Sequence, residues 1–175
     1  MVNREEGLTA TTTTQRGAPL IRCVGRSLGR TSDANTKFLQ KQVEFLDQNK
    51  EVDVCYGELL ISNVPNQKFE FCGSNRKWPT LEGTLENQLR HNSPHCLPMW
   101  RKSIHDDVGL FDTKYFSAAD YDMWFKVLKN GGKLAKMDEI VGLYYENPTS
   151  ISRNKKTLSR AISEVNEVRS KYLNL

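Results

Sequence analysis

Two carboxylates, Asp120 and Asp122, lie near the start of the stretch SAADYDMWFKVLKNGG at 117–132. Ser117 can cap a helix that begins at Ala118, with Asp120 three positions later in a capping-box arrangement, and the final glycine pair ends this helix. A carboxylate at a helix N-terminus stays ionised, while nearby aromatic residues can raise its basicity. Asp120 therefore has the properties of a general base, and a purely structural capping role stays open beside this reading.

The same helix has an apolar face formed by Tyr121, Trp124, Phe125 and Leu128, which recur at spacings of three and four. This spacing predicts packing against a core, and it favours a core role for Trp124 over stacking on a sugar. Asp122 lies about 200° around the helix from the first carboxylate, so the two cannot share one task. We expect Asp122 to make surface salt bridges.

Before this helix, the sequence predicts elements that could position it. A helix is expected from residue 38 to 48, a strand at 52–62, a second strand around the alternating phenylalanines of 68–72, and a short helix at 84–92. The strands at 52–62 and 68–72 are predicted to pair. Two prolines confine HCLPMW at 95–100 to an extended segment, and a helical turn follows it.

After the helix, KLAKMDEIVGLYYE at 133–146 predicts one or two strands. A C-terminal helix follows, with an apolar stripe formed by Leu158, Ile162, Val165, Val168 and Tyr172. Together these elements predict an α/β fold: a short mixed sheet with flanking helices and a C-terminal helix.

Composition limits the class of protein. The chain has 175 residues, 38% of them hydrophobic and 26% charged, with a net charge of +4, which suits one ordinary domain and does not favour a nucleic-acid-binding surface. No apolar run reaches the roughly 18 residues of a membrane span, and the N-terminus lacks the pattern of a secretory signal. We therefore expect a cytoplasmic protein with no integral membrane segment.

The cysteine and histidine pattern does not favour a metal or disulfide site. Cys23 and Cys55 are far from each other and from Cys72 and Cys96, and no C-x-x-C pair occurs, so reduced thiols are expected. His91, His95 and Cys96 form H-x-x-x-H-C and could be combined with Cys72 into a zinc site. That spacing differs from structural zinc sites, and a shaped acceptor surface or a buried packing role for His95 is preferred.

Composition changes near residue 36. Every basic residue before this point is arginine, and the segment is rich in Thr and Gly, whereas lysine dominates from Lys37 onward. We expect residues 1–36 to be disordered, because they bury too little apolar surface to offset their ordering entropy. Residues 37–175 are expected to form the folded portion.

The order of elements and motifs in 37–175 resembles the acceptor half of family 2 inverting glycosyltransferases of the GT-A (Rossmann-like) fold. The resemblance is carried by the segment at 100–102, by GLFD at 109–112, and by Ala119-Asp120 at the start of a helix. It implies transfer of a sugar from a nucleotide-sugar donor to a saccharide or other hydroxyl acceptor, with Asp120 as the catalytic base. It also implies acceptor-binding roles for Trp100, Arg101, His95 and Trp124.

The family's donor site is only partly matched. The resemblance implies contacts to the donor diphosphate from Ser150, Ser152 and Arg153, although a polar turn that caps the next helix explains these residues as well. It implies a divalent cation, Mg²⁺ or Mn²⁺, for the intact enzyme, and the positions that correspond to metal ligands are Asp33 and Asn147. The N-terminal nucleotide-binding half with its D-x-D motif is missing, so a truncated chain is expected.

Two functions follow as hypotheses. The first is an inverting glycosyltransferase represented by its acceptor half. The second is a non-catalytic fragment that binds a carbohydrate or a protein partner. In either case, half of a doubly covered sheet leaves strand edges and apolar faces open, and this predicts self-association through exposed apolar surface.

Overall fold

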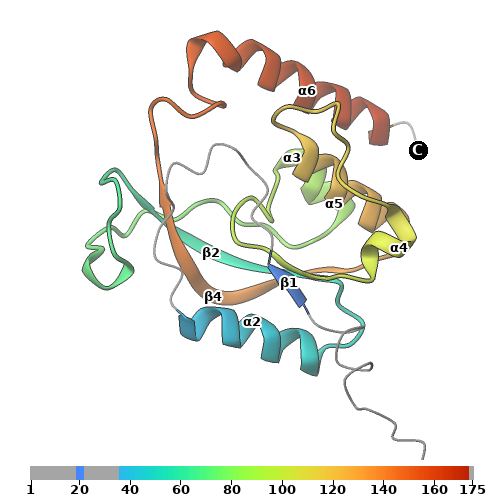
Figure 1. The fold of residues 1–175 in the computed structure, drawn as a ribbon, viewed down its shortest axis with the longest axis horizontal. Coiled ribbons are helices and arrows are strands. Elements are labelled where there is room, and N and C mark those ends of the chain that lie inside the picture. Colours follow the sequence, from blue (N-terminus) through green and yellow to red (C-terminus); the bar gives the residue numbers. More distant parts are fainter. Residues whose placement is uncertain (1–18, 22–35, 174–175) are drawn as a thin grey trace, which may run out of the picture.

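The computed structural model describes residues 19–21 and 36–173. A four-stranded mixed sheet forms the centre, with strand order β1-β3-β2-β4 (Figure 1). Its strands are β1 (Pro19–Ile21), β2 (Val54–Ser62), β3 (Met99–Arg101) and β4 (Leu134–Tyr145). β2 and β4 are parallel, and β3 is antiparallel to both of its neighbours. The predicted α/β fold with a short mixed sheet is confirmed.

Helices cover both faces of this sheet (Figure 1). α2 (Thr36–Gln48) lies on one side, and α5 (Ala119–Lys129), α3 (Leu85–Arg90) and the C-terminal α6 (Lys155–Leu173) lie on the other. A short helix, α4 (Ile104–Val108), follows β3. The crossover from β2 to the parallel β4 contains α3, β3, α4 and α5, so α5 starts and ends next to the sheet that it covers.

The long pairing of β2 with β4 has an irregularity at Gly57. The register runs from Val54 opposite Leu134 to Ser62 opposite Tyr145 and shifts on either side of Glu58. A Cβ on Gly57 would lie 2.0 Å from Cγ1 of Val141 and 2.6 Å from the carbonyl oxygen of Glu139. Only glycine allows the two strands to approach this closely at the bulge.

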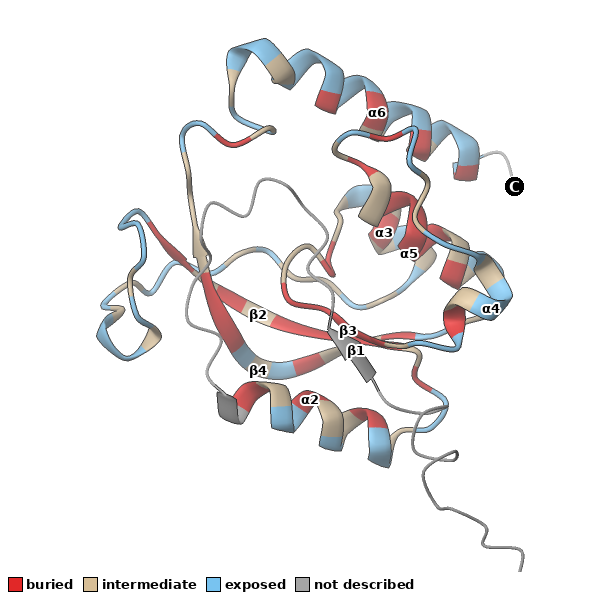
Figure 2. Ribbon diagram, viewed as in Figure 1, coloured by how far each residue is buried: buried red, intermediate tan, exposed pale blue. Residues whose placement is uncertain are grey.

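Each sheet face packs into its own core, as the buried segments in Figure 2 indicate. Under α2 lies a cluster centred on Phe38, Leu46, Leu59 and Met99. On the opposite face, Trp100 and Trp124 pack edge to face with ring centroids 5.6 Å apart. These large side chains hold α5 firmly on the sheet, because burying each of them stabilises the fold by about 2 kcal/mol or more.

A third cluster joins α5 to α6 and does not involve the sheet. Phe125 stacks on Tyr172 with ring centroids 4.7 Å apart, and Val168, Tyr121 and Ala118 complete the cluster. α6 is therefore attached to α5 by an apolar contact as well as by the polar contacts described below.

Most predicted helices are confirmed, and the end of α5 shows why. Asn130 is followed by Gly131 at φ +82°, and the amide of Gly132 donates to the carbonyl of Val127 at 2.8 Å. This is the Schellman arrangement that glycine favours, since a residue without Cβ adopts positive φ without strain. The short helix predicted at 84–92 runs from Leu85 to Arg90, and Thr84 caps it by accepting with Oγ1 from the amide of Asn87 at 3.1 Å.

Two predictions about local structure are wrong. The expected strand at 68–72 is a 3₁₀ helix, η1 (Phe69–Phe71), with Phe71 73% exposed, so the alternation of the two phenylalanines has no sheet to face. On α6 the predicted stripe is correct for Val168 and Tyr172, which are buried, and for Val165, which packs against the same cluster. It is wrong for Leu158 and Ile162, which are exposed, while Ala161 and Glu164 are buried.

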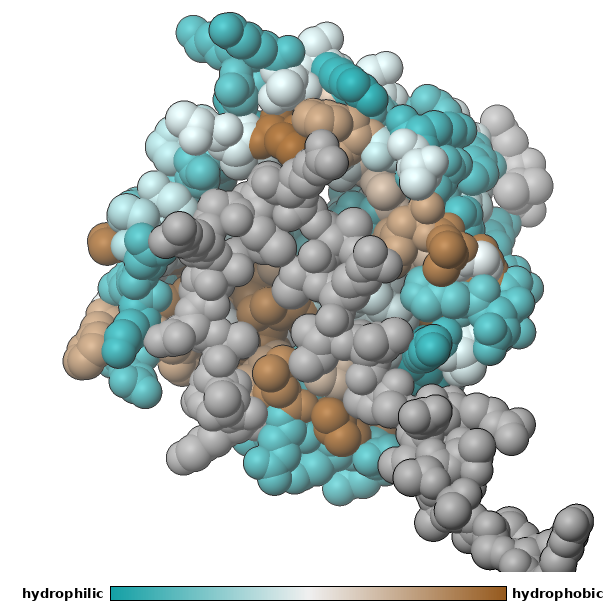
Figure 3. All heavy atoms as spheres, viewed as in Figure 1, coloured by the Kyte–Doolittle hydropathy of each residue, from teal (hydrophilic) through white to brown (hydrophobic). Residues whose placement is uncertain are grey.

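Within residues 1–36, the structure describes only the backbone of Pro19–Ile21 and of Thr36, and no side chain. Residues 19–21 form β1, a strand that the expectation of disorder did not include; the rest of that prediction falls outside the described residues. Within the described ranges, no helix is long and apolar enough to cross a membrane. In Figure 3 the surface over α2 is hydrophilic, and apolar surface lies beside it over the sheet.

Candidate active site at the start of α5

Asp120 lies in the first turn of α5 and is only partly exposed. Its Oδ2 accepts from Nδ2 of Asn92 at 3.1 Å, and its Oδ1 accepts from the amide of Tyr121 at 2.8 Å. Burial raises the pKa of Asp120 to about 6, against the opposing effect of these two hydrogen bonds. Near pH 7 this carboxylate is ionised but a stronger base than an exposed aspartate, which matches the requirement for a general base.

The predicted capping box does not form. Ala118 occupies the N-cap position without a side-chain cap, and the Asp120 carboxylate bonds to the next amide rather than to Ser117. The cap comes instead from α6: the Glu164 carboxylate accepts from the amides of Phe116 (3.0 Å), Ser117 (2.7 Å) and Ala118 (3.3 Å). Asp120 therefore accepts from one first-turn amide of α5 but forms no capping box with Ser117.

Asn92, the partner of Asp120, is positioned by the end of α3. Tyr121 donates its hydroxyl to the carbonyl of Gln88 at 2.5 Å, and Arg169 of α6 donates Nε to that hydroxyl at 3.1 Å and Nη2 to the carbonyl of Arg90 at 3.0 Å. α3 ends one residue before His91, so these bonds hold the segment that carries Asn92.

An aromatic cluster adjoins Asn92 through the preceding residue, His91. Trp78 stacks on His95 with ring centroids 4.3 Å apart, and it lies 4.9 Å from Tyr144 and 5.7 Å from His91. Trp78 sits beside β2, where its amide donates to Leu59, and Tyr144 sits near the carboxyl end of β4. Carboxyl ends of parallel strands are where α/β sheets commonly bind ligands.

The polar atoms of this cluster are unusual. Nε1 of Trp78 and Nε2 of His91 are both buried without a hydrogen-bond partner in the protein. Burial, together with the neighbouring His91, lowers the pKa of His95 to about 4, so its imidazole is neutral at pH 7. The exposed part of this aromatic surface suits a ligand ring that can stack on it.

Three of the expected acceptor-binding residues lie elsewhere. Trp100 and Trp124 are each 1% exposed in the core between α5 and the sheet. Arg101 donates Nε to the carbonyl of Val52 at 2.9 Å and an Nη2 hydrogen to Asn49 at 3.2 Å and to Leu46, so it binds the end of α2. Only His95 lies in the aromatic cluster.

The expected donor contacts lie just after β4. Ser150 is buried and its Oγ lacks a protein partner, whereas Ser152 is exposed. Arg153 pairs with Glu146, which also accepts from Nη2 of Arg76 at 2.9 Å. The predicted polar turn is present, and the three residues are near one another along the chain but show no arrangement specific for a diphosphate.

The described residues do not fit the divalent cation that the family resemblance implies. Oδ1 of Asn147 already accepts from the amide and Oγ1 of Thr149 at 2.9 and 2.8 Å, an Asx turn. Asp33 lies outside the described residues. Among those described, no three His, Cys, Asp or Glu side chains come together as a metal site, so no chemical step is assigned to a metal below.

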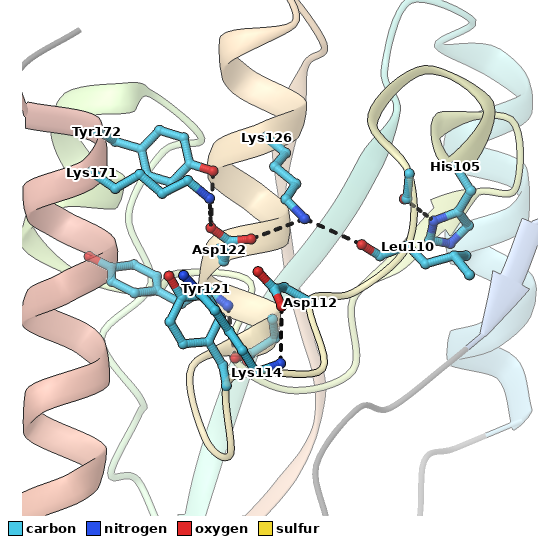
Figure 4. A network of polar contacts seen from close by, with 12 residues as sticks. His105, Leu110, Asp112, Lys114, Tyr121, Asp122, Lys126, Lys171 and Tyr172 are labelled. Carbon is cyan, nitrogen blue, oxygen red and sulfur yellow. Dashed lines mark hydrogen bonds and ion pairs between the residues drawn. The ribbon is translucent and has the colours of Figure 1, made fainter.

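Asp122 is fully buried and does not make the surface salt bridge that we expect from the sequence (Figure 4). Its carboxylate is bound by Lys171 Nζ at 2.8 Å, Lys126 Nζ at 3.1 Å and the Tyr172 hydroxyl at 3.0 Å. Burial alone would raise the pKa of Asp122, but the two lysines outweigh it and lower that pKa. The sequence could not indicate this burial, because Lys171 and Tyr172 come from α6.

Sequence reasoning also missed Trp78, Asn92 and Glu164. Asn92 reaches the start of α5, and Trp78 reaches His91 and His95, only in the folded chain, and no local pattern marks them. Glu164 did carry a signal: it interrupts the apolar positions of α6 on the face that is buried.

Comparisons with known proteins leave the family of this chain open. No protein-family model matches it, and no curated protein matches it. Eight chains of solved structures match, among them the crystal structure of S. aureus TarS, which is 16% identical to this chain with a TM-score of 0.43. That match covers 78% of this chain and 25% of the other, so the chain spans about a quarter of TarS. The fold and the site define an α/β protein in which an aspartate with a raised pKa, Asp120, lies at the start of a helix.

Proposed function

We propose that this chain is the acceptor portion of an inverting glycosyltransferase, with Asp120 as its catalytic base. The observation that carries the proposal is the Asp120 carboxylate: partly exposed at the start of α5, bound to Asn92, and with its pKa raised to about 6. The order of motifs along the sequence supports it. The likeness to TarS, a family 2 glycosyltransferase, is too distant to add support.

In the proposed reaction, an acceptor hydroxyl attacks the anomeric carbon of a nucleotide sugar. The new carbon–oxygen bond forms as the bond from that carbon to the nucleoside diphosphate breaks, and the hydroxyl proton moves to Asp120. The nucleoside diphosphate leaves with the electron pair. Asn92 and the amide of Tyr121 each donate a hydrogen bond to one carboxylate oxygen, which orients Asp120 and leaves a further lone pair on each oxygen to take the proton.

The test is sugar transfer from UDP- and GDP-sugars, with and without Mn²⁺ or Mg²⁺, using the wild-type chain and Asp120→Asn. We expect Asp120→Asn to lower transfer by about 10²-fold or more, with little change in donor binding. Asp106→Asn is the matched control, because Asp106 is an exposed carboxylate in the first turn of another helix, α4. Full activity in Asp120→Asn would rule the proposal out.

A second candidate, carbohydrate binding without transfer, is favoured by the aromatic cluster alone. Trp78 and Tyr144 are partly exposed aromatic residues that can stack on a sugar ring. Calorimetry with oligosaccharides separates the candidates: a binder loses affinity in Trp78→Ala, retains it in Asp120→Asn, and never releases nucleoside diphosphate from a nucleotide sugar.

A further inference from the structure

α6 contacts both segments that form the hydrogen bond between Asn92 and Asp120. Its Glu164 binds the three amides at the entry to α5, and its Arg169 binds the carbonyl of Arg90 at the end of α3. Figure 1 shows α6 on the same side of the sheet as α3 and α5. One helix, far along the chain from both, thus determines where the two residues lie.

Glu164 acts where α5 lacks a cap of its own. An amide at the entry to a helix has no intrahelical acceptor, and leaving it buried without a partner destabilises the fold. The Glu164 carboxylate accepts from the amide of the N-cap residue Ala118 and from the amides of Phe116 and Ser117 just before it. It also accepts from the Ser117 hydroxyl at 3.1 Å, and Arg160 binds it at 2.9 Å. Burial alone would raise the pKa of Glu164, but these donors outweigh burial and lower it to about 2.

We propose that Glu164 is a positioning residue: by capping α5 from α6, it fixes the backbone two residues before Asp120 and so the orientation of that carboxylate toward Asn92 and the acceptor. The catalytic meaning of this role rests on the proposed function. The positional role does not, because it is a relationship between two carboxylates that can be measured without substrate.

The experiment is an NMR titration of the Asp120 side-chain carboxyl carbon in the whole chain, comparing the wild type with Glu164→Gln. Glutamine is nearly isosteric but carries no charge, and with one side-chain oxygen in place of two it can accept from fewer of the three amides. Water then reaches the start of α5 and a neighbouring negative charge is lost, and both changes favour the ionised form of Asp120. We expect its pKa to fall by about half a unit or more.

Glu167→Gln is the matched control. Glu167 lies on the same helix one turn further on and also binds the loop before α5, through Lys114 at 2.9 Å and Tyr115 at 3.2 Å, but it does not cap the helix. We expect no change in the Asp120 pKa. An equal fall in both variants, or no fall in a folded Glu164→Gln, would overturn the proposal.

Ser117→Ala provides a milder test should Glu164→Gln fail to fold. It removes one hydrogen bond to Glu164 and should lower the Asp120 pKa less, in the same direction; an unchanged pKa would count against the positioning role. Where transfer is measurable, the rise of kcat/KM with pH in Glu164→Gln should shift to lower pH by the same amount as the titration. Unchanged transfer in Asp120→Asn refutes the proposed function, while the titration still decides the role of Glu164.

Discussion

Asn92 donates its side-chain amide to Asp120 across 28 residues of sequence, and this 3.1 Å bond joins the end of α3 to the start of α5. It stabilises the ionised carboxylate and therefore opposes the effect of burial on the Asp120 pKa. Because the bond joins two segments far apart in the sequence, the pKa of Asp120 depends on the tertiary structure.

Replacing Asn92 should make Asp120 still more basic. In Asn92→Leu the hydrogen bond is lost while burial remains, so we expect the Asp120 pKa to rise above about 6. The NMR titration measures this directly. Asn87→Leu is the control, because Asn87 lies in α3 before Asn92 and its side chain bonds only to the carbonyl of Glu82. A fall of the Asp120 pKa in Asn92→Leu would contradict the geometry.

The raised pKa of Asp120 also predicts how stability depends on pH. An acid whose folded pKa exceeds its unfolded value, here about 6 against 3.8, destabilises the fold increasingly as pH rises from 4 to 7. Asp120→Asn should therefore be more stable than the wild type by about 1–3 kcal/mol at pH 7.5, with a difference near zero at pH 3.5.

Urea unfolding at several pH values measures this difference. Asp106→Asn, at an exposed position, should show no such trend. If the stability of Asp120→Asn relative to the wild type fell between pH 4 and pH 7.5, the carboxylate would not be desolvated.

The buried network around Asp122 predicts that removing Asp122 and removing one of its partners destabilise the fold by very different amounts. Asp122→Ala leaves Lys126, Lys171 and the Tyr172 hydroxyl without their shared acceptor, and we expect a loss of about 3–5 kcal/mol in the free energy of unfolding. Lys171→Met should cost less than about 1 kcal/mol, because Lys171 is 41% exposed and Asp122 keeps two partners. Chemical denaturation compares the two; similar losses would refute a buried network.

The close approach of β2 and β4 predicts a further destabilising substitution. In Gly57→Ala the new methyl group would collide with the carbonyl of Glu139, a backbone atom that can move only if the strands separate. We expect a loss of about 2 kcal/mol or more. Gly73→Ala is the control, since a Cβ there meets nothing within 4 Å, and thermal melts of both variants would show whether the difference exists.

The sequence by itself determined where the helices lie and where α5 ends, because the deciding interactions there are local. The glycines after Asn130 and the threonine before α3 act within one turn of the helix that they bound. It also determined that α5 has an apolar face, because a period of 3.6 residues is a property of the helix alone. Asp120 was identified at this level, by its place at a helix start and by the resemblance.

Only the tertiary structure decided what surrounds that carboxylate. Glu164 replaces the local capping box, Asn92 binds Asp120, and Trp78 forms the adjacent aromatic surface, each from a segment at least 28 residues away. The side of α6 that is buried was likewise set by its partner, since Glu164 gains four donors there while Ile162 remains in water. A contact between distant segments produces no repeating pattern in either segment. For this reason the sequence alone does not show which residues surround Asp120.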